Sequence, residues 1–387
     1  MGLTEILVVA GEASGDGHAA ALVTQLRERD PGLRFFGMGG SKMAAAGVDL
    51  LYGSHEISVM GFAEVAPKLR RILAVMRGLM RAAVRRRPAC AVLVDVPDFN
   101  LRMAARLKRL GIPVVYYVSP MLWAWRSGRI RQIARDVDTM LCILPFEEAY
   151  YRERGVEARY VGSPVLEAVP PPAPATQFRR ELGVQVEAPT LAMLPGSRPS
   201  EVARLLPTLA RAAKLLKSEK PDLQILVPVA PGLSPSDFEE TFRKAGVEVI
   251  LIAGQAPQVV GASDVAVVAS GTATLEAGLM NRPVVVVYRV SSLTYWIGRA
   301  LIRLPYFSLL NLLAQRKLVP ELIQDQMTPV RIAAEVRRLW SGPEREALLG
   351  GLSEVRGRLG SPGAAKRAAE AVWAHLHAEG CYAPPPL

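Results

Sequence analysis

Residues 8–18, VVAGEASGDGH, place three glycines within seven positions directly behind a run of apolar residues. The spacing of Gly11, Gly15 and Gly17 does not match G-x-G-x-x-G, and the Lys-Ser/Thr pair of a P-loop is missing. The stretch therefore predicts a strand, a polar glycine-rich turn and a helix that starts near residue 18. Such a turn, at the carboxyl end of a first strand, is either purely structural or part of a ligand site.

The same alternation of short apolar runs and helical segments continues along the chain, which predicts parallel strands covered by helices on both faces. A proline-rich stretch at 161–175 interrupts it and is typical of a semi-rigid linker. The expected strands before it are 5–11, 34–40, 89–95, 114–119 and 139–145, and those after it are 190–197, 222–231, 248–254, 264–271 and 283–290.

This pattern predicts an α/β protein with two doubly wound, Rossmann-like domains that face a central cleft. We expect an N-terminal domain over 1–168 and a second domain over 176–340. Segments 330–340, 344–359 and 363–379 have helical character. We expect the residues of 341–387 to pack back on the first domain or on a second copy of the chain, as in a homodimer.

Composition limits the class of protein. The chain has 387 residues, more than one hydrophobic core usually organises. Its formal net charge of +11 favours an anionic partner, which could be a nucleotide, a nucleic acid or a membrane surface. Its three cysteines form no C-x-x-C pair, so we expect buried thiols in a reducing compartment and neither a disulfide framework nor a metal site. With no signal peptide pattern and no long apolar run, the prediction is a cytoplasmic protein with peripheral membrane contact.

Carboxylates stand out in the first half. Glu12 and Asp16, with Ser14 and Gly15, suit the hydroxyl groups of a sugar rather than a phosphate. Asp95 ends a very apolar strand, where partial desolvation would bring its pKa toward that of a general base.

Other polar groups follow in the same half. Asp98 is a further candidate carboxylate, although capping of the next helix explains it as well. In VSPMLWAWRSGR (118–129), Trp125 and Arg126 suit a sugar or phosphate, and buried packing of a tryptophan is equally compatible.

Two junctions in the second half have the residues of a nucleotide site. In LPGSRPSEV (194–202), Gly196, Ser197 and Arg198 lead into a helix and predict an anion site, unless the arginine fastens a domain interface. In ASGTATLEAG (269–278), small and hydroxyl residues suit phosphate while Glu276 suits a ribose diol. The residues of that second junction are Ser270, Gly271, Thr272 and Thr274, and simple helix capping is the alternative for the threonines.

Positive charge is concentrated in one segment. Residues 68–87 hold eight Lys and Arg residues, with no acidic residue between Glu64 and Asp95. The spacing predicts a basic amphipathic helix whose apolar stripe, from Leu69 to Ala83, either packs in the core or meets an anionic bilayer. No aromatic residues are interleaved with the charge, which disfavours nucleic acid. The apolar, aromatic segment 291–313 could line a pocket for acyl chains or be a packed helix pair.

Several motifs together resemble the lipid-A-disaccharide synthase family. They are GEASGD, SVMGFAEV, DVPDFN, YVSPMLWAWR, LPFE, LPGSRPSEV, ASGTATLE and SLLNLLA, in the family's order between about residues 5 and 325. The resemblance implies an inverting, metal-independent GT-B glycosyltransferase without a cofactor. It would join UDP-2,3-diacylglucosamine to 2,3-diacylglucosamine 1-phosphate and form a β-1,6 disaccharide and UDP, at the cytoplasmic face of the inner membrane.

The resemblance also implies residue roles. Asp95 would be the leading base candidate, Arg198 a contact to the diphosphate, Glu276 the ribose ligand and Asn311 an active-site residue. The chain departs from the family's usual residues at three positions: Ser163 stands for His, Leu310 for Pro and Ala13 for Thr.

Other functions remain open on sequence alone. A UDP-sugar 2-epimerase, an N-acetylglucosaminyltransferase with a polyprenyl acceptor, or a sugar-nucleotide binding protein without turnover would share the two-domain pattern.

Overall fold

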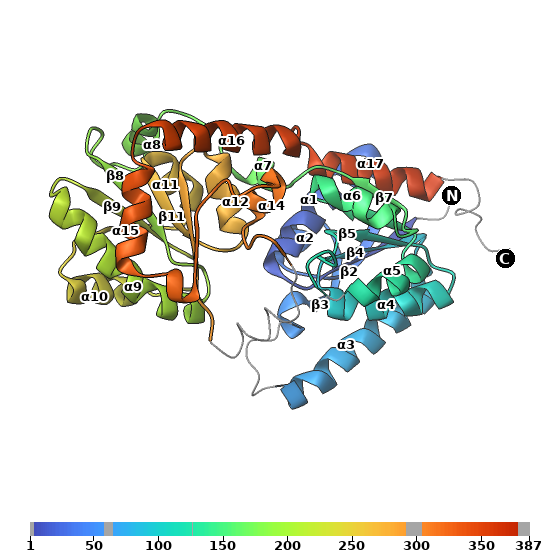
Figure 1. The fold of residues 1–387 in the computed structure, drawn as a ribbon. Helices are drawn as coiled ribbons and strands as arrows, with labels where there is room; N and C mark the ends of the chain where they lie inside the picture. The colour runs from blue at the N-terminus through green and yellow to red at the C-terminus, as the bar shows by residue number, and fades with distance from the viewer. Residues whose placement is uncertain (1–3, 58–64, 126, 292–303, 378–387) are drawn as a thin grey trace. The chain divides into compact units, whose positions relative to one another are not determined.

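The computed structural model describes residues 4–57, 65–125, 127–291 and 304–377. The chain forms two compact units (Figure 1). Unit 1 contains residues 1–164 together with 361–387, and unit 2 contains residues 165–360. The chain thus leaves unit 1 after Pro164 and returns to it at Ser361.

Unit 1 is built on one parallel sheet of seven strands in the order β3-β2-β1-β4-β5-β6-β7. Consecutive strands run outward from β1 in one direction and then outward from β4 in the other, so the strand order reverses between β1 and β4. The strands are β1 (Glu5–Ala10), β2 (Arg34–Gly39), β3 (Asp49–Gly53), β4 (Cys90–Val94), β5 (Val114–Tyr117), β6 (Thr139–Cys142) and β7 (Ala158–Tyr160).

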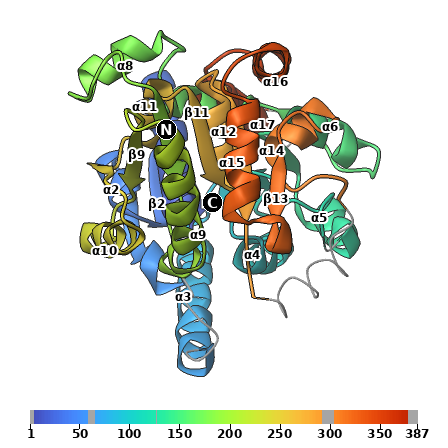
Figure 2. The same ribbon diagram turned by 60° about the vertical axis from the view of Figure 1, so that its left-hand side comes forward.

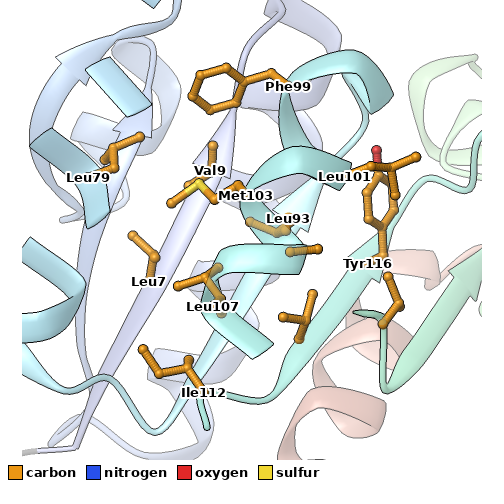
Figure 3. Packing of buried hydrophobic residues seen from close by; sticks show 14 of the residues in the cluster. Leu7, Val9, Leu79, Leu93, Phe99, Leu101, Met103, Leu107, Ile112 and Tyr116 are labelled. Carbon is orange, nitrogen blue, oxygen red and sulfur yellow. The ribbon is translucent and has the colours of Figure 1, made fainter. Parts of the chain in front are cut away.

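Both faces of this sheet are apolar, because helices cover each of them. On one face Leu7, Val9 and Leu93 pack with Met103 and Leu107 of α4 (Pro97–Arg109), as Figure 3 shows. That face is also covered by α3 (Val65–Arg86), α5 (Ile130–Asp136) and α6 (Pro145–Arg152).

The alternate side chains of the same strands point to the opposite face of the sheet. There α1 (Ala13–Arg29) packs beside α17 (Ala364–His377), and Leu22, Val23 and Val372 join one core cluster. Short elements complete the unit: α2 (Ser41–Ala45), η1 (Ser54–Glu56) and η3 (Ser127–Arg129).

Unit 2 repeats the plan with six parallel strands in the order β10-β9-β8-β11-β12-β13. Its order reverses between β8 and β11. The strands are β8 (Thr190–Leu194), β9 (Gln224–Val229), β10 (Ile250–Ala253), β11 (Val265–Ala269), β12 (Val284–Tyr288) and β13 (Glu321–Ile323). The helices are α7 (Val165–Ala168), α8 (Ala175–Glu181), α9 (Pro199–Glu219), α10 (Pro235–Ala245), α11 (Ala256–Ala262), α12 (Thr272–Leu279), α14 (Leu309–Ala314), α15 (Pro329–Arg338) and α16 (Pro343–Leu359), with η4 (Gln324–Gln326).

All ten expected strands form, within a few residues of their expected bounds. Three further strands, β3, β7 and β13, lie at sheet edges and have only three to five residues. The segment expected as a linker contains α7, which contacts α12. The residues of 341–387 divide between the units, because α16 packs on α14 and α12 of unit 2 while α17 packs on α1 of unit 1.

Candidate active site

The reversal of strand order in unit 1 brings two carboxylates together. β1 and β4 are neighbours in register, with Ala10 beside Val94, so the residues that follow each strand meet at the carboxyl edge of the sheet. Those residues include Glu12 after β1 and Asp95 after β4. Crevices at such reversals are where open α/β sheets bind ligands.

The turn that holds Asp95 is strained. Asp95 and Val96 both have left-handed backbone angles, with φ of 54° and 43°. A β-branched residue rarely adopts this conformation, which costs on the order of 1 to 3 kcal/mol and persists only where the surroundings enforce it. The conformation lets the chain turn sharply between β4 and α4.

Several hydrogen bonds enforce this turn. The backbone N–H of Asp95 donates to the Tyr117 carbonyl over 3.0 Å, and the Tyr116 hydroxyl donates to the Asp95 carbonyl over 2.5 Å. The buried Asn100 side chain donates to the carbonyls of Asp95 and Val94. These hydrogen bonds fix the backbone that carries the Asp95 carboxyl group.

The local environment raises the pKa of Asp95. Burial is the main cause and the negative charge of Glu12 adds to it, while a hydrogen bond from the Val96 backbone acts in the opposite direction. A carboxyl group whose pKa rises toward the working pH is a better proton acceptor than an ordinary aspartate. Asp95 thus combines a place at the carboxyl edge of the sheet with a pKa raised above that of an ordinary aspartate.

The glycine-rich turn behind β1 is shorter than expected. Helix α1 begins at Ala13, with Glu12 at its N-cap position, so Gly15 and Gly17 belong to the helix. Ser14 is exposed in the first helical turn. Gly15 lies close to Val94, at ordinary contact distances for an added Cβ.

Asp16 was expected to bind a sugar, but its carboxylate bonds to the backbone of the fold. Its carboxylate is 5 % exposed and accepts hydrogen bonds from the backbone N–H groups of Gly40, Lys42 and Met43. These bonds fasten the start of α2 to α1. The side chain is thus occupied by the fold, and a short acidic residue in a turn gives no sequence signal of such a distant partner.

Asp98 lies in the first turn of α4 and forms an ion pair with Arg129 of η3. This pair joins the turn after β4 to the segment that follows β5. In that segment the Trp125 side chain is 37 % exposed, and its backbone N–H donates to the Met121 carbonyl. Arg126, the other expected ligand here, lies outside the described residues.

A buried carboxylate that sequence reasoning did not single out lies beside this segment. Glu147 in α6 is 1 % exposed and accepts hydrogen bonds from Ser119, Trp123 and the Leu144 backbone. Burial raises its pKa to about 7, against the effect of these hydrogen bonds. The signal available in the sequence was the glutamate at the third helical position of PFEE, which is typical of a helix N-terminus.

The corresponding reversal in unit 2 joins β8 to β11, and its carboxyl edge has a different character. Gly196 has a left-handed φ of 114°, and an added Cβ would meet the Glu201 side chain at 2.8 Å. Ser197 and Arg198 follow at the start of α9, both exposed. The Arg198 guanidinium is 3.7 Å from Glu201, and its side chain is 76 % exposed, so it is available to an anion.

The second junction of unit 2 brings Ser270, Gly271 and Thr272 to the start of α12, next to this edge. Thr274 is fully buried and its hydroxyl donates to the Gly271 carbonyl, so it supports the turn and does not face a ligand. Burial raises the pKa of Glu276, one turn further along the helix.

Asn311 is also used by the fold. It is fully buried; its amide donates to Val319 and Glu321, and its oxygen accepts from the N–H groups of Leu318 and Val319. The neighbouring Leu310 is fully buried as well, and Ser163 is 1 % exposed in unit 1. Asn311 therefore orders the segment that carries it instead of presenting its amide to a substrate.

The apolar stripe of the basic helix α3 divides along its length. Val75, Met76 and Leu79 are buried in the core, whereas Leu69 and Leu73 near the start of the helix are 46 % and 41 % exposed. Figure 2 shows this end of α3 extending past the other helices of unit 1.

The arginines of α3 and of the residue after it fall into two groups, those with ion pairs to acidic residues and those that are exposed. Arg86 binds Glu5 and Asp49 and lies over the Phe36 ring, and Arg71 pairs with Glu56. Exposed cations remain at Arg70, Arg77, Arg81, Arg85 and Arg87.

Within the described ranges, no group of three or more His, Cys, Asp or Glu side chains is arranged to hold a metal ion. The Asp136-x-Asp138 pair lies before β6, at the amino edge of the sheet, where Asp136 binds Arg135 and Asp138 binds Lys108. Among the same residues, every helix is too short or too polar to cross a bilayer.

The amino-acid sequence matches one protein family over most of its length. The family profile described as lipid-A-disaccharide synthetase matches residues 6–348. The chain is 62 % identical over 368 residues to a lipid-A-disaccharide synthase of Myxococcus xanthus, covering 95 % of this chain and 96 % of the relative. It is 54 % identical over 370 residues to the same enzyme of Anaeromyxobacter dehalogenans, covering 95 % and 96 %.

Solved structures share the fold at low sequence identity. The structure of S. aureus MnaA with UDP matches with a TM-score of 0.63 and 13 % identity, covering 96 % of both chains. MurG of Acinetobacter baumannii matches with a TM-score of 0.61 and 15 % identity, covering 96 % of this chain and 99 % of that one. These similarities confirm two parallel-sheet α/β domains of the GT-B glycosyltransferase type.

Proposed function

This chain belongs to the lipid-A-disaccharide synthetase family, and from that premise we propose how its residues divide the work of the reaction. The enzyme is a glycosyltransferase of lipid A biosynthesis. It joins UDP-2,3-diacylglucosamine to 2,3-diacylglucosamine 1-phosphate, giving the β-1,6-linked disaccharide 1-phosphate and UDP. Attack by a neutral hydroxyl requires a base, and departure of UDP requires stabilisation of negative charge.

Asp95 is the general base in this proposal. It accepts the proton of the acceptor's 6-hydroxyl as that oxygen attacks the anomeric carbon of the donor sugar, and the bond from this carbon to the UDP oxygen breaks. The observation that carries the assignment is a carboxyl group with a raised pKa, held in a strained turn at the point where strand order reverses.

Glu12 tunes this base. Its charge is one cause of the raised pKa of Asp95, and it stands across the reversal at the N-cap of α1. The Glu12 carboxylate can accept hydrogen bonds from hydroxyl groups of the acceptor sugar, and the Ser14 hydroxyl can accept or donate them. Asp16 acts only indirectly, by holding α1 to α2.

The departing diphosphate is bound by unit 2. Arg198 supplies a forked, permanently charged donor. The backbone N–H groups of Ser197, just before α9, and of Thr272, at the start of α12, add further donors. Ser270 and Gly271, directly before α12, line the same proposed diphosphate site. Glu276, whose pKa is raised by burial, accepts hydrogen bonds from the ribose diol.

Both substrates carry acyl chains, so the enzyme must reach them at a membrane surface. We assign this contact to the exposed side of α3, where Leu69 and Leu73 near its start are followed by exposed arginines toward its end. Each cation near an anionic bilayer contributes about 1 kcal/mol, and apolar side chains add to this by partial insertion. This contact would keep the enzyme peripheral to the cytoplasmic face of the inner membrane.

The Asp95→Asn variant tests the proposed base. We expect disaccharide formation to fall about 10²- to 10⁴-fold, because no base is left to take the proton of the sugar's 6-hydroxyl group. UDP should bind with unchanged affinity. Product is measured by mass spectrometry with both acylated sugars, and UDP affinity by calorimetry. Loss of UDP binding together with activity would contradict the assignment, and a variant with wild-type turnover would exclude Asp95 as the base.

The same variant has an internal control for folding. A carboxyl group whose folded pKa is raised contributes stability that is fully present below its unfolded pKa and is lost as pH rises through the folded value. At pH 8 the uncharged asparagine is therefore expected to unfold at the same or a higher temperature than wild type. A lower melting temperature would mean that lost activity reflects lost structure.

A further inference from the structure

Glu147 forms the centre of a buried polar cluster that the proposed chemistry does not use. Its Oε2 accepts the Ser119 hydroxyl over 2.7 Å and the Leu144 backbone N–H over 3.0 Å, and its Oε1 accepts the Trp123 indole N–H over 3.0 Å. A buried carboxylate is costly unless such donors satisfy it. Its donors come from two loops, one after β5 and one after β6, so the carboxylate ties adjacent strand ends together.

The segment that Glu147 holds, residues 119–125, is fixed at several other points. Val118, directly before it, has a left-handed φ of 65°. The Tyr151 hydroxyl donates to the Pro120 carbonyl over 2.6 Å, and the Trp123 ring packs edge-on against Phe146 with ring centroids 5.0 Å apart. The Ser119 side chain is almost fully buried.

One side of this segment is nevertheless open and apolar. Met121 is 48 % exposed and Trp125 is 37 % exposed, and the backbone bond from Trp125 to Met121 puts both in one turn. The segment follows β5, whose Tyr116 and Tyr117 hold the Asp95 backbone. Beyond the segment, Arg129 returns to Asp98 near the same turn. The segment is thus held by Glu147, and the residues that contact the turn of the proposed base lie directly before and after it in the chain.

We propose that Glu147 is a positioning residue for acceptor recognition, which holds residues 119–125 so that Met121 and Trp125 form an apolar wall for the acylated acceptor beside Asp95. Glu147 does not touch the substrate. It acts through Ser119 and Trp123, whose positions set that of the wall. The inference rests on the proposed function and adds a determinant of the acceptor site to it.

The Glu147→Gln variant tests this role because an amide cannot replace the carboxylate here. The two N–H donors lie on different oxygens, and glutamine has only one oxygen, so in either orientation its NH₂ group faces an N–H. We expect the acceptor KM to rise about tenfold, which corresponds to part of one buried charge-assisted hydrogen bond. The UDP-sugar KM should stay unchanged and kcat should change by less than about threefold. Glu153→Gln, on the exposed end of the same helical region, is the matched control.

A second variant separates positioning from general loss of structure. Trp123→Phe removes the indole N–H that would face the glutamine NH₂ group of Glu147→Gln. The double variant Glu147→Gln/Trp123→Phe should therefore raise the acceptor KM less than the sum of the two single effects predicts. Additive effects, or an equal rise in both substrates' KM values, would overturn the proposal.

If Glu147→Gln does not fold, Ser119→Ala supplies the test. It removes one donor and leaves both N–H bonds, so a smaller rise confined to the acceptor KM is expected, and an unchanged acceptor KM would refute the role. Failure of the proposed function is distinguishable, because wild-type enzyme would then form no disaccharide from the two acylated sugars.

Discussion

At the scale of single residues, the proposed active site depends on how the environment changes ordinary side chains. Asp95 gains basicity from burial and from the charge of Glu12. Arg198 is suited to an anion because its guanidinium is exposed at a helix start.

The pH dependence of turnover tests the coupling between Glu12 and Asp95. A general base works in its deprotonated form, so kcat/KM rises with pH through the pKa of Asp95. Glu12→Gln removes a charge that raises this pKa, and the acid limb of the profile should therefore move to lower pH. Glu28→Gln, exposed at the far end of α1, should leave the limb in place. A limb that moves to higher pH, or does not move, would contradict the coupling.

The Arg198→Ala variant tests the diphosphate site. Loss of a charge-assisted hydrogen bond costs about 1.5 to 3 kcal/mol, so UDP affinity should fall about 10- to 100-fold. Arg198→Lys should have an intermediate UDP affinity, because lysine keeps the positive charge but lacks the paired N–H donors of the guanidinium. Arg211→Ala, further along α9 and exposed, provides the comparison in the same calorimetric titration. Equal losses in the two alanine variants would point to a diffuse charge effect.

The sequence located the strand ends that carry the candidate residues, but not the hydrogen-bond partner of every polar side chain there. Asp95, Gly196 and Arg198 could be singled out because each lies shortly after the end of an apolar strand. The roles of Asp16 and Asn311 could not be predicted, because whether a polar group binds a ligand or a backbone depends on partners 24 and 8 residues away. Glu147 was missed for the same reason, since its partner Ser119 is 28 residues distant.

At the scale of secondary-structure elements, long apolar strands were predictable and short edge strands were not. Buried parallel strands appear as continuous Val, Ile and Leu runs, whereas β3, β7 and β13 are short, lie at edges and carry polar residues. Helix α3 shows the limit for helices. Its amphipathic period was evident, but only packing decides that Leu79 is buried and Leu73 is exposed.

Charge reversal on α3 tests its proposed membrane contact. Replacing Arg77, Arg81 and Arg85 by Glu should weaken binding to anionic phospholipid vesicles at least tenfold, and wild-type binding should fall as salt rises. The matched control replaces three exposed arginines of α4, Arg102, Arg106 and Arg109, and changes net charge equally. Sedimentation with vesicles measures both. Equal losses in the two triple variants, or salt-insensitive binding, would argue against this surface.

At the scale of the whole molecule, two units of related plan carry different chemistry. The carboxyl edge of unit 1 presents carboxylates, and that of unit 2 presents a guanidinium and helix starts. In the proposed function, unit 1 provides the base and unit 2 provides the anion site. Alternating apolar runs were enough to predict two such units. The expectation that residues 341–387 pack back on the first domain is met by α17, whereas α16 packs on unit 2.

The dependence of unit 1 on α17 can be tested by a single substitution. Val372 is fully buried on the face that meets α1, so Val372→Asp should destabilise unit 1 by on the order of 3 kcal/mol. Ala374→Asp, on the exposed side of the same helix, is the control. Hydrogen exchange should show faster opening of β1 and β4 with β8 and β11 unchanged. Uniform protection in the Val372 variant would mean that α17 adds little to unit 1.

The departure of the chain after Pro164 and its return at Ser361 has a consequence for biosynthesis. When the first sheet has left the ribosome, roughly 200 further residues must be translated before its last covering helix exists, which takes about 10 to 40 s at bacterial rates. During that interval the nascent chain exposes the apolar side chains of α1 that α17 later covers. Until α17 has been synthesised, this apolar surface is open to contacts with other chains, and slow synthesis of the second unit would prolong that exposure.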